Sequence, residues 1–410
     1  MRSRRFLPIV LIIALLIDWY VFQAIKTVTQ GMAPRSRSIL FAAYWGLSIL
    51  ALASFVLLPL LHLQYSRASS YVIAIILGFY IAKLLALVFL LADDLRRVSL
   101  WLFSLAHHRP ADTGAPAIPR STFLSWLGLG LGGGIFGALV YGFSNKYNYK
   151  IHRVKLAFDN LPPTFKGLKI IQLSDIHSGS LANPEAVGRG IDRVLAEQPD
   201  LILFTGDLVN NLATEMKDYQ AVFSRLRAPM GIFSTLGNHD YGDYAGWESA
   251  EAKKANLDRL KQIQREMGWR LLMNEHVVLE KDGGQIALIG IENWSAKARF
   301  PKYGRMDLAY PGAGKYPFQI LMSHDPSHWD AEVRPLYPDI DLMLSGHTHG
   351  MQFGIEIPGL KWSPVQFLYR QWAGLYTEGR QHLYVNRGFG FIGYPGRFGI
   401  LPEITVFELT

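Results

Sequence analysis

The stretch Gly346-His347-Thr348-His349-Gly350 decides how this chain is interpreted. It follows the apolar run 342–344, which indicates a short buried strand that ends in a glycine-flanked loop. Alternate residues of an extended segment point the same way, so we expect His347 and His349 to face one site. Imidazole is a common metal ligand, and the stretch therefore predicts part of a metal site at a strand end.

Four other segments place similar ligand types where short apolar runs end. They are Leu173-Ser174-Asp175-Ile176-His177, Thr205-Gly206-Asp207, Gly237-Asn238-His239-Asp240 and Ser323-His324-Asp325-Pro326. Carboxylate and imidazole groups suit divalent Mn, Fe or Zn. Two such ions about 3.5–4 Å apart share an anionic ligand, and they make a water between them acidic enough to attack phosphorus near neutral pH. The set predicts a centre for two divalent metal ions.

The composition is uneven along the chain. Of the 410 residues, 50% are hydrophobic, and the apolar residues are concentrated in the first third. The sequence has no cysteine, which excludes disulfides and thiolate metal sites. The net charge is +8, and many Lys and Arg residues flank the apolar runs, which lipid headgroups explain more simply than nucleic acid. We expect a lipid bilayer as a partner and no nucleic acid.

Four apolar runs in this first third are long enough to span a membrane. They cover residues 6–25, 39–61, 71–91 and 123–143. A cleaved signal peptide is the alternative for the first run, but further spans follow it, so we favour an anchor. The apolar segment 99–106 is too short to span and is expected at the interface, followed by a polar loop over 107–120.

Charged and small residues inside these runs have two interpretations. Asp18 and Lys83 mark either a functional site or an internal ion pair, and pairing is the simpler expectation. The pairs Gly130/Gly134 and Gly133/Gly137 are spaced to pack against another helix.

The side of the membrane is not decided by charge, because the basic residues on the two sides nearly balance. Arg120-Ser121-Thr122-Phe123-Leu124 before a glycine-rich apolar run is similar to a twin-arginine export signal that lacks its second arginine. We therefore expect a multi-pass protein of the bacterial inner membrane whose following domain lies outside the cytoplasm.

From Tyr149 onward the pattern is that of a soluble α/β domain, so we expect a membrane region over 1–145 and this domain over 146–410. Asn183 and Pro184 predict the start of a helix, and further helices are expected over 214–227 and 250–267. Asp282-Gly283 predicts a hairpin turn. Strands are expected at 151–158, 169–173, 201–205, 232–236, 277–280, 285–291, 319–322, 342–344, 383–385 and 404–409.

The ordered series Asp-x-His, Gly-Asp, Gly-Asn-His-Asp, His and Gly-His-x-His resembles the calcineurin-like metallophosphoesterases over residues 149–410. The chain is similar to the membrane-tethered bacterial phosphoesterases in its N-terminal spans and in its ending, with Val385-Asn386-Arg387-Gly388 and with Arg397 before Pro402-Glu403-Ile404. The resemblance implies a four-layer αββα sandwich with its site at the strand ends.

The resemblance also implies a role for each matched residue. One metal ion would take Asp175, His177, Asp207 and His349. The second would take Asp207, Asn238, His324 and His347, so that Asp207 bridges the two. His239 would lie over the phosphate as a catalytic residue, oriented by Asp240, although Asp240 also suits a capping role.

Residues outside the series keep a second interpretation. Asn386 and Arg387 either contact the substrate or only close a turn. The basic loop from Lys297 to Arg305 either contacts an anionic substrate or lipid, or is a solvated loop.

We interpret the chain as a membrane-anchored, dinuclear metal-dependent phosphoesterase. It would hydrolyse a phosphoester or pyrophosphate bond of a phosphorylated small molecule or a lipid-linked substrate. The alternative is a non-catalytic membrane sensor or scaffold that binds a phosphorylated ligand through the same domain, and the complete ligand set argues against it. A transporter with an appended enzyme is disfavoured because the spans show no inverted repeat.

Overall fold

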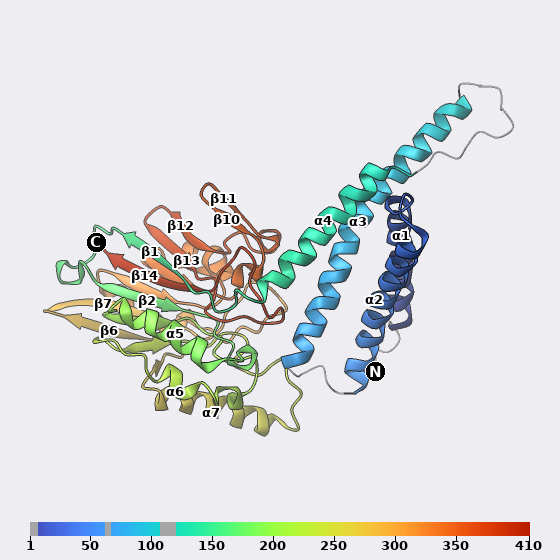
Figure 1. Ribbon diagram of the computed structural model, residues 1–410. Coiled ribbons are helices and arrows are strands. Elements are labelled where there is room, and N and C mark those ends of the chain that lie inside the picture. The colour runs from blue at the N-terminus through green and yellow to red at the C-terminus, as the bar shows by residue number, and fades with distance from the viewer. Residues whose placement is uncertain (1–6, 62–66, 107–119) are drawn as a thin grey trace. The chain divides into compact units, whose positions relative to one another are not determined.

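The computed structural model describes residues 7–61, 67–106 and 120–410. The chain divides into two compact units, Met1–Tyr141 and Gly142–Thr410 (Figure 1).

The first unit is helical. Its helices are α1 (Leu7–Val28), α2 (Pro34–Leu60), α3 (Arg67–Ala106) and α4 (Thr122–Gly142). Within the described residues, these four are long and apolar enough to cross a membrane, which confirms the predicted spans. We expected a separate short segment over 99–106, and this expectation was wrong, because these residues continue α3. Asp93 pairs with Arg96 and Asp94 with Arg97 one turn further along the helix, so the helix passes this charged stretch without a break.

The charged residues inside the spans, Asp18 and Lys83, form an ion pair with each other, which confirms the simpler of the two expectations. Lys83 of α3 forms a buried ion pair with Asp18 of α1. The Asp18 carboxylate also accepts hydrogen bonds from Ser48 Oγ of α2 and from the Tyr80 hydroxyl of α3, each at 3.1 Å. The ion pair is therefore fully hydrogen-bonded and joins three helices.

The glycines that approach a neighbouring helix differ from those that we predicted. Gly130 and Gly134 have open space where a side chain would begin. A Cβ at Gly132 would instead lie 2.4 Å from the Ala82 carbonyl oxygen of α3, and one at Gly128 would lie 3.1 Å from that of Ala86. The close approach thus uses a glycine pair one helical turn apart on a different face of α4.

The second unit contains two six-stranded sheets. The first has the order β1-β14-β2-β3-β4-β5, and the second has the order β12-β13-β9-β8-β7-β6. The strands of the first sheet are β1 (Lys150–Leu156), β14 (Glu403–Leu409), β2 (Lys169–Leu173), β3 (Leu201–Phe204), β4 (Ile232–Ser234) and β5 (Arg270–Leu271). Those of the second are β12 (Gly374–Glu378), β13 (Gln381–Val385), β9 (Leu342–Ser345), β8 (Gln319–Met322), β7 (Gly284–Gly290) and β6 (Glu275–Lys281). A separate hairpin is formed by β10 (Ile355–Ile357) and β11 (Leu360–Trp362).

Alternating side chains of the strands build the layers. Ile170 of β2 and Leu342 of β9 point into a core between the two sheets. Their neighbours Ile171 and Met343 point outward, into cores that helices cover. Helices α5 (Pro184–Ala196), α6 (Gln220–Phe223) and α7 (Ala250–Glu266) cover the first sheet, and α8 (Met306–Ala309) and α9 (Arg334–Leu336) lie on the side of the second. The four-layer αββα arrangement is therefore confirmed.

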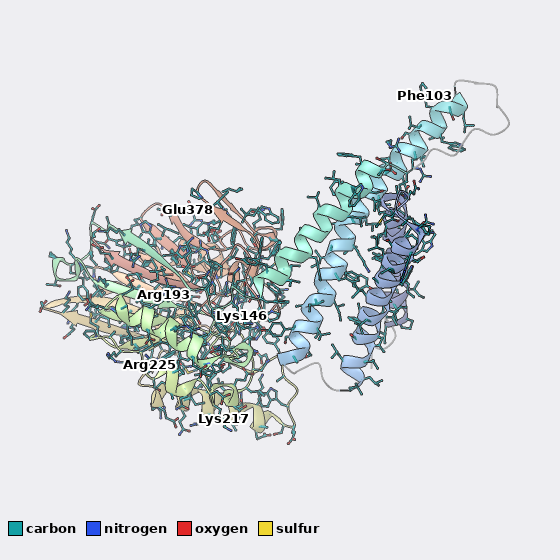
Figure 2. The ribbon with its side chains drawn as sticks, viewed as in Figure 1. Phe103, Lys146, Arg193, Lys217, Arg225 and Glu378 are labelled. Atoms are coloured by element: carbon teal, nitrogen blue, oxygen red, sulfur yellow. The ribbon has the colours of Figure 1, made fainter. Side chains whose placement is uncertain are left out.

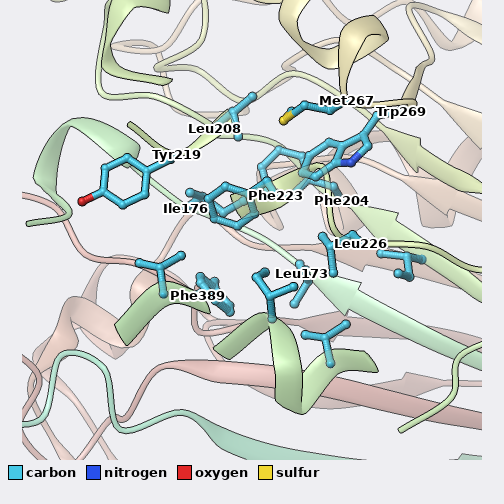
Figure 3. Close-up of a cluster of buried hydrophobic side chains, with 14 of the residues drawn as sticks. Leu173, Ile176, Phe204, Leu208, Tyr219, Phe223, Leu226, Met267, Trp269 and Phe389 are labelled. Atoms are coloured by element: carbon cyan, nitrogen blue, oxygen red, sulfur yellow. The ribbon is translucent and has the colours of Figure 1, made fainter. Parts of the chain in front are cut away.

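The outer layer of the first sheet shows how the sequence specifies its helices. Asn183 caps α5 by accepting a hydrogen bond from the Ala186 N–H at 2.8 Å, as predicted. Aromatic rings fill the space beneath, with Phe204 and Trp269 at a centroid distance of 5.3 Å (Figure 3). Charged side chains such as Arg193 and Lys217 lie on the exposed surface (Figure 2). The single helix expected over 214–227 was wrong, because the 3₁₀ turn Ala213–Met216 precedes a separate one-turn helix, α6.

Candidate metal centre

The predicted ligands meet at the carboxyl ends of parallel strands from both sheets. Strands β2, β3 and β4 are parallel neighbours in the first sheet, and β8 and β9 are parallel neighbours in the second. The ligands follow β2 (Asp175, His177), β3 (Asp207), β4 (Asn238), β8 (His324) and β9 (His347, His349). Segments far apart in sequence are thus brought to one edge of the sandwich.

The backbone at these strand ends is unusual. Several of the predicted ligands adopt a left-handed conformation, with φ of 52° at Asp175, 48° at His177, 60° at Asp207, 70° at His347 and 51° at His349. Such conformations are costly and cluster at functional sites. Gly346 is required by close approach, because a Cβ there would lie 1.9 Å from Ser174 Oγ. The loops are therefore shaped to aim side chains at one point.

One group of ligand atoms comes from Asp175, His177 and His349, all buried. His349 Nε2 lies 3.2 Å from Asp175 Oδ1 and 3.0 Å from His177 Nε2. Burial raises the pKa of Asp175, but the adjacent His349 and the nearby His324 together lower it below its ordinary value, so the carboxyl group stays ionised. Burial lowers the pKa of both histidines, which keeps them neutral and able to act as ligands.

A second group comes from Asp207, His324 and His347. His324 Nε2 lies 3.1 Å from Asp207 Oδ2, while its Nδ1–H donates to the Thr205 carbonyl at 2.7 Å. That hydrogen bond fixes the ring and leaves Nε2 for a ligand role. The buried Asn238 Oδ1 has no hydrogen-bond partner among the described residues.

Asp207 belongs to the second group but also lies next to the first, because its Oδ2 is 3.5 Å from His177 Nε2. The converging donor atoms are carboxylate oxygens and imidazole nitrogens. The Asn238 amide oxygen, which lacks a protein donor, follows β4 in the same sheet as β2 and β3. Divalent transition metals accept this donor set, so the residues present fit bound metal ions.

His239 borders the first group without joining it. Its ring packs edge-on against His177 at a centroid distance of 5.0 Å, and it is less buried than the ligands around it. Its Nδ1–H donates to the Asn210 carbonyl oxygen at 2.8 Å, which leaves Nε2 available to a substrate. The rings of Tyr244 and His239 lie 4.6 Å apart.

Asp240 holds the backbone rather than the His239 ring. Its carboxylate accepts hydrogen bonds at 2.8–3.2 Å from four main-chain N–H groups, those of Asp207, Leu208, Val209 and Gly237. Burial and the nearby Asp207 charge raise the pKa of Asp240 to about 7. The orienting contact that we expected from Asp240 thus comes from Asn210, and Asp240 fits the capping alternative.

Asn386 and Arg387 lie behind the ligand loops and are buried. Asn386 Nδ2 donates to Thr405 Oγ1 at 2.8 Å, and Arg387 Nη1 lies 2.6 Å from Glu403 Oε2. Arg387 also pairs with Glu356. These partners favour the structural alternative, and contact with a substrate stays a prediction.

Two contacts near the ligands were not found by sequence reasoning. The Tyr369 hydroxyl lies 2.9 Å from His347 Nε2 and 3.3 Å from Asp325 Oδ2. The fully buried Arg397 donates to the carbonyl oxygens of Arg387 and Gly388 at 2.7 and 3.2 Å, which braces the loop beside His349. The resemblance pointed to Arg397 but not to this role, and no local pattern indicated Tyr369, because each residue reaches the site only through tertiary folding.

Both parts of the chain match known families. Residues 3–146 match a family described as a probable calcineurin-like phosphoesterase transmembrane domain, and residues 168–351 match the calcineurin-like phosphoesterases.

Named relatives agree with these matches. The chain is 32% identical over 299 residues to the uncharacterized metallophosphoesterase YkuE of Bacillus subtilis, which covers 67% of this chain and 95% of the relative. It is 28% identical to the phosphodiesterase YaeI of Escherichia coli, over 67% of this chain and 92% of the relative. It is 29% identical to a transmembrane protein with a metallophosphoesterase domain of Danio rerio, over 65% of this chain and 59% of the relative. With its ligand groups at the strand ends and its four apolar helices, this chain belongs to the calcineurin-like metallophosphoesterases, a family of phosphoester hydrolases.

Proposed function

We propose that this chain hydrolyses a phosphoester or pyrophosphate bond at a centre of two divalent metal ions. The position of Asp207 carries the proposal. Its Oδ2 lies 3.1 Å from His324 Nε2 and 3.5 Å from His177 Nε2, so one carboxylate borders both ligand groups. A carboxylate between two cations is what a dinuclear centre requires.

The proposed ligands divide between two ions. Asp175, His177, Asp207 and His349 would hold one, and Asp207, Asn238, His324 and His347 would hold the other. Bound divalent ions supply Lewis-acid polarisation of a phosphoryl oxygen and lower the pKa of an attacking water. The protein's part is to fix these side chains on strand ends that its two sheets hold rigidly.

His239 is proposed as the residue that acts on the substrate directly. The Asn210 carbonyl accepts the Nδ1–H and so fixes the direction of the ring. The Nε2 atom can then stabilise charge on the transferring phosphoryl group or exchange a proton with the leaving oxygen.

The substrate is proposed to be lipid-linked, on the grounds of a short tether. Helix α4 ends at Gly142 and β1 begins at Lys150. Seven residues cannot extend beyond about 23–25 Å at 3.3–3.6 Å each. Gly142 is the first residue of the second unit, and its carbonyl oxygen accepts a hydrogen bond from the Arg397 N–H at 2.9 Å. This hydrogen bond attaches the start of the tether to the folded domain. The catalytic unit must therefore work close to the bilayer.

The basic loop after Trp294 supports an anionic substrate. The Phe300 ring lies edge-on to His347 at a centroid distance of 4.8 Å, and Lys297 Nζ lies 5.2 Å from the centre of the Tyr369 ring. Lys297 and Arg299 are exposed. Cations beside the ligand groups would attract a phosphorylated headgroup.

The catalytic unit is further proposed to lie outside the cytoplasm of a bacterial inner membrane. The motive is the similarity of Arg120-Ser121-Thr122-Phe123-Leu124 to an export signal.

An activity screen of the purified full chain tests the function. Aryl phosphomonoesters, phosphodiesters, nucleotide-linked lipid pyrophosphates and phospholipids are each offered with Mn, Fe, Zn or no metal. We expect metal-dependent hydrolysis, with preference for a lipid-linked substrate. Tight binding of a phosphorylated ligand with no turnover under any metal would support the sensor alternative instead.

A further inference from the structure

Exposed apolar side chains in the second unit are concentrated in one segment. Most of the large ones lie between Met351 and Leu375. The others described in this unit are scattered: Leu212, Tyr244, Leu308 and Leu336. A contiguous apolar patch on a folded domain marks an interaction surface more often than scattered single residues do.

The β10–β11 hairpin supplies half of this segment, and its register separates its two faces. Ile355 pairs with Trp362 and Ile357 pairs with Leu360, so these four side chains share one face. Ile357 is 59% exposed and Leu360 is 49% exposed. The outward face of the hairpin is therefore entirely apolar.

The opposite face of the hairpin attaches it to the domain. Glu356 forms an ion pair with the buried Arg387. Lys361 Nζ donates to the Ala373 carbonyl oxygen and lies 5.1 Å from the centre of the Trp372 ring. Glu356 and Lys361 both contact residues of the domain, so their face of the hairpin points toward it. The apolar face therefore points away from the domain. Figure 1 shows the hairpin beside β12 and β13.

The apolar surface continues toward the metal centre. The 3₁₀ turn Pro364–Phe367 follows β11, and Phe367 is 78% exposed while Leu368 is 50% exposed. The next residue is Tyr369, whose hydroxyl contacts His347. The surface thus ends at a residue that touches a proposed metal ligand.

The same surface begins close to the point where the last membrane helix ends. Gly142, the last residue of α4, accepts a hydrogen bond from the Arg397 N–H. The next residue, Phe398, donates to the Gln352 carbonyl at 2.9 Å and accepts from the Gly354 N–H at 2.9 Å. Strand β10 starts at the residue after Gly354. Two hydrogen-bonded steps therefore connect the end of a membrane-spanning helix to the apolar hairpin.

We propose that Ile355, Ile357, Leu360, Trp362, Phe367 and Leu368 form a docking surface for the lipid bilayer, in addition to the four spans. The aliphatic and Phe side chains enter the boundary between headgroups and acyl chains, and Trp362 suits the interface itself. Docking through this surface holds the Tyr369 side of the metal centre against the headgroups. Docking through this surface fixes the orientation of the catalytic unit on the membrane. The membrane spans alone do not fix this orientation.

The test uses the full chain, whose lack of cysteine allows single labels. Ile357→Cys is labelled with a polarity-sensitive fluorophore and reconstituted into liposomes with or without nitroxide-bearing lipids. The control is Leu336→Cys, because Leu336 is 65% exposed in the same unit but lies on α9, outside the surface. Leu360→Cys repeats the measurement at a second position, and circular dichroism checks that each labelled protein is folded.

We expect blue-shifted emission and loss of intensity with nitroxide lipids for the labels at 357 and 360, and neither effect for the label at 336. Equal behaviour of all three labels would overturn the proposal. A blue shift that ignores nitroxide lipids and grows with the protein-to-lipid ratio would also overturn it, by showing that a second copy or another protein covers the surface. None of these readouts requires turnover, so they stand apart from the proposed hydrolysis.

Discussion

The Asp240 carboxylate accepts a hydrogen bond from the Asp207 backbone N–H at 2.9 Å. It holds the neighbouring Leu208 N–H at 2.8 Å in the same way. The acidic residue of the Gly-Asn-His-Asp segment therefore shapes the loop that carries Asp207. Asp240 is a positioning residue, whereas His239 is the residue that we propose to act on the substrate.

Asp240→Asn should weaken metal binding and folding together. An amide offers one acceptor oxygen, and its NH₂ group would face main-chain N–H groups, leaving buried donors unsatisfied at about 1–3 kcal/mol. Metal content and denaturant unfolding measure the two effects. Asp282→Asn, at the exposed β6–β7 turn, is the control and should change neither. If Asp240→Asn lost turnover alone, Asp240 would act on His239, as the sequence first indicated.

His239→Ala should keep its metal and lose catalysis. The side chain lies outside both ligand groups, so metal content should match that of the unmodified chain. Turnover should fall by roughly 10²–10⁴-fold, the usual contribution of a general acid or base. Metal analysis beside steady-state kinetics decides the matter. Loss of metal on this substitution would show that His239 is a ligand instead.

Arg387→Met should destabilise the fold strongly. Removing the guanidinium leaves the buried Glu403 carboxylate without its partner, which costs about 3–5 kcal/mol. Arg259→Met is the control, because Arg259 pairs with Glu266 at 2.8 Å between two exposed side chains, and the change should cost at most about 1 kcal/mol. Unfolding in denaturant compares the two. An unchanged stability with a raised KM would support the predicted substrate role for Arg387.

The same ion pair predicts a pH dependence of stability. Burial raises the pKa of Glu403, but Arg387, His152 and the hydrogen bonds from Thr405 and Tyr384 together lower it more, to about 2 from the ordinary 4.5. A carboxyl group whose pKa is lower in the folded state stabilises the fold above its unfolded pKa. The stabilisation should therefore be complete above pH 4.5 and be lost as the pH falls toward 2. Unfolding of Arg387→Met should lack this part of the pH profile, and identical profiles would contradict the assignment.

The membrane side is tested with paired reporters fused after Thr410. Alkaline phosphatase, which is active only outside the cytoplasm, should give a signal, and a reporter active only inside should give none. Because four helices span, a reporter at the N-terminus should give the same answer as one at the C-terminus. An inside-only signal would rule out the extracytoplasmic assignment.

The tether predicts a preference for substrates in the bilayer. Full-length protein in liposomes is compared with a soluble fragment that begins at Lys146, on lipid-linked and soluble phosphoesters. The full chain should favour the lipid-linked substrate, because its site is held near headgroups, and the fragment should lose that preference. If the ratio of activity on lipid-linked to soluble phosphoesters were the same for both proteins, the anchor would only localise a hydrolase of soluble substrates.

Local signals predicted the elements that local chemistry specifies. Strand β2 matches its expected bounds, and Asn183 and Pro184 start α5 as expected, because period and capping are encoded within a few residues. The candidate metal ligands could be predicted because they follow short apolar strands, and the family resemblance supplied the role expected of each. Segment 99–106 was misread because the charges before it pair within α3.

Other features depend on residues that are distant in sequence. Strands β10 and β11 have three residues each and gain their place from Glu356 and Lys361, which local patterns do not show. The contact between Tyr369 and His347 joins two loops that no motif relates. The roles of Asp240 and Arg387 depend on which partners the fold places beside them.

The most direct test of the central claim is the metal content of the purified full chain and of Asp207→Asn, measured by elemental analysis beside turnover. If Asp207 is shared by two ions, the unmodified chain should hold two divalent ions per molecule and hydrolyse a phosphoester. Asp207→Asn should lose occupancy at both positions, and turnover with it. A single ion per active chain, or two ions retained by Asp207→Asn, would contradict a dinuclear centre joined by this carboxylate.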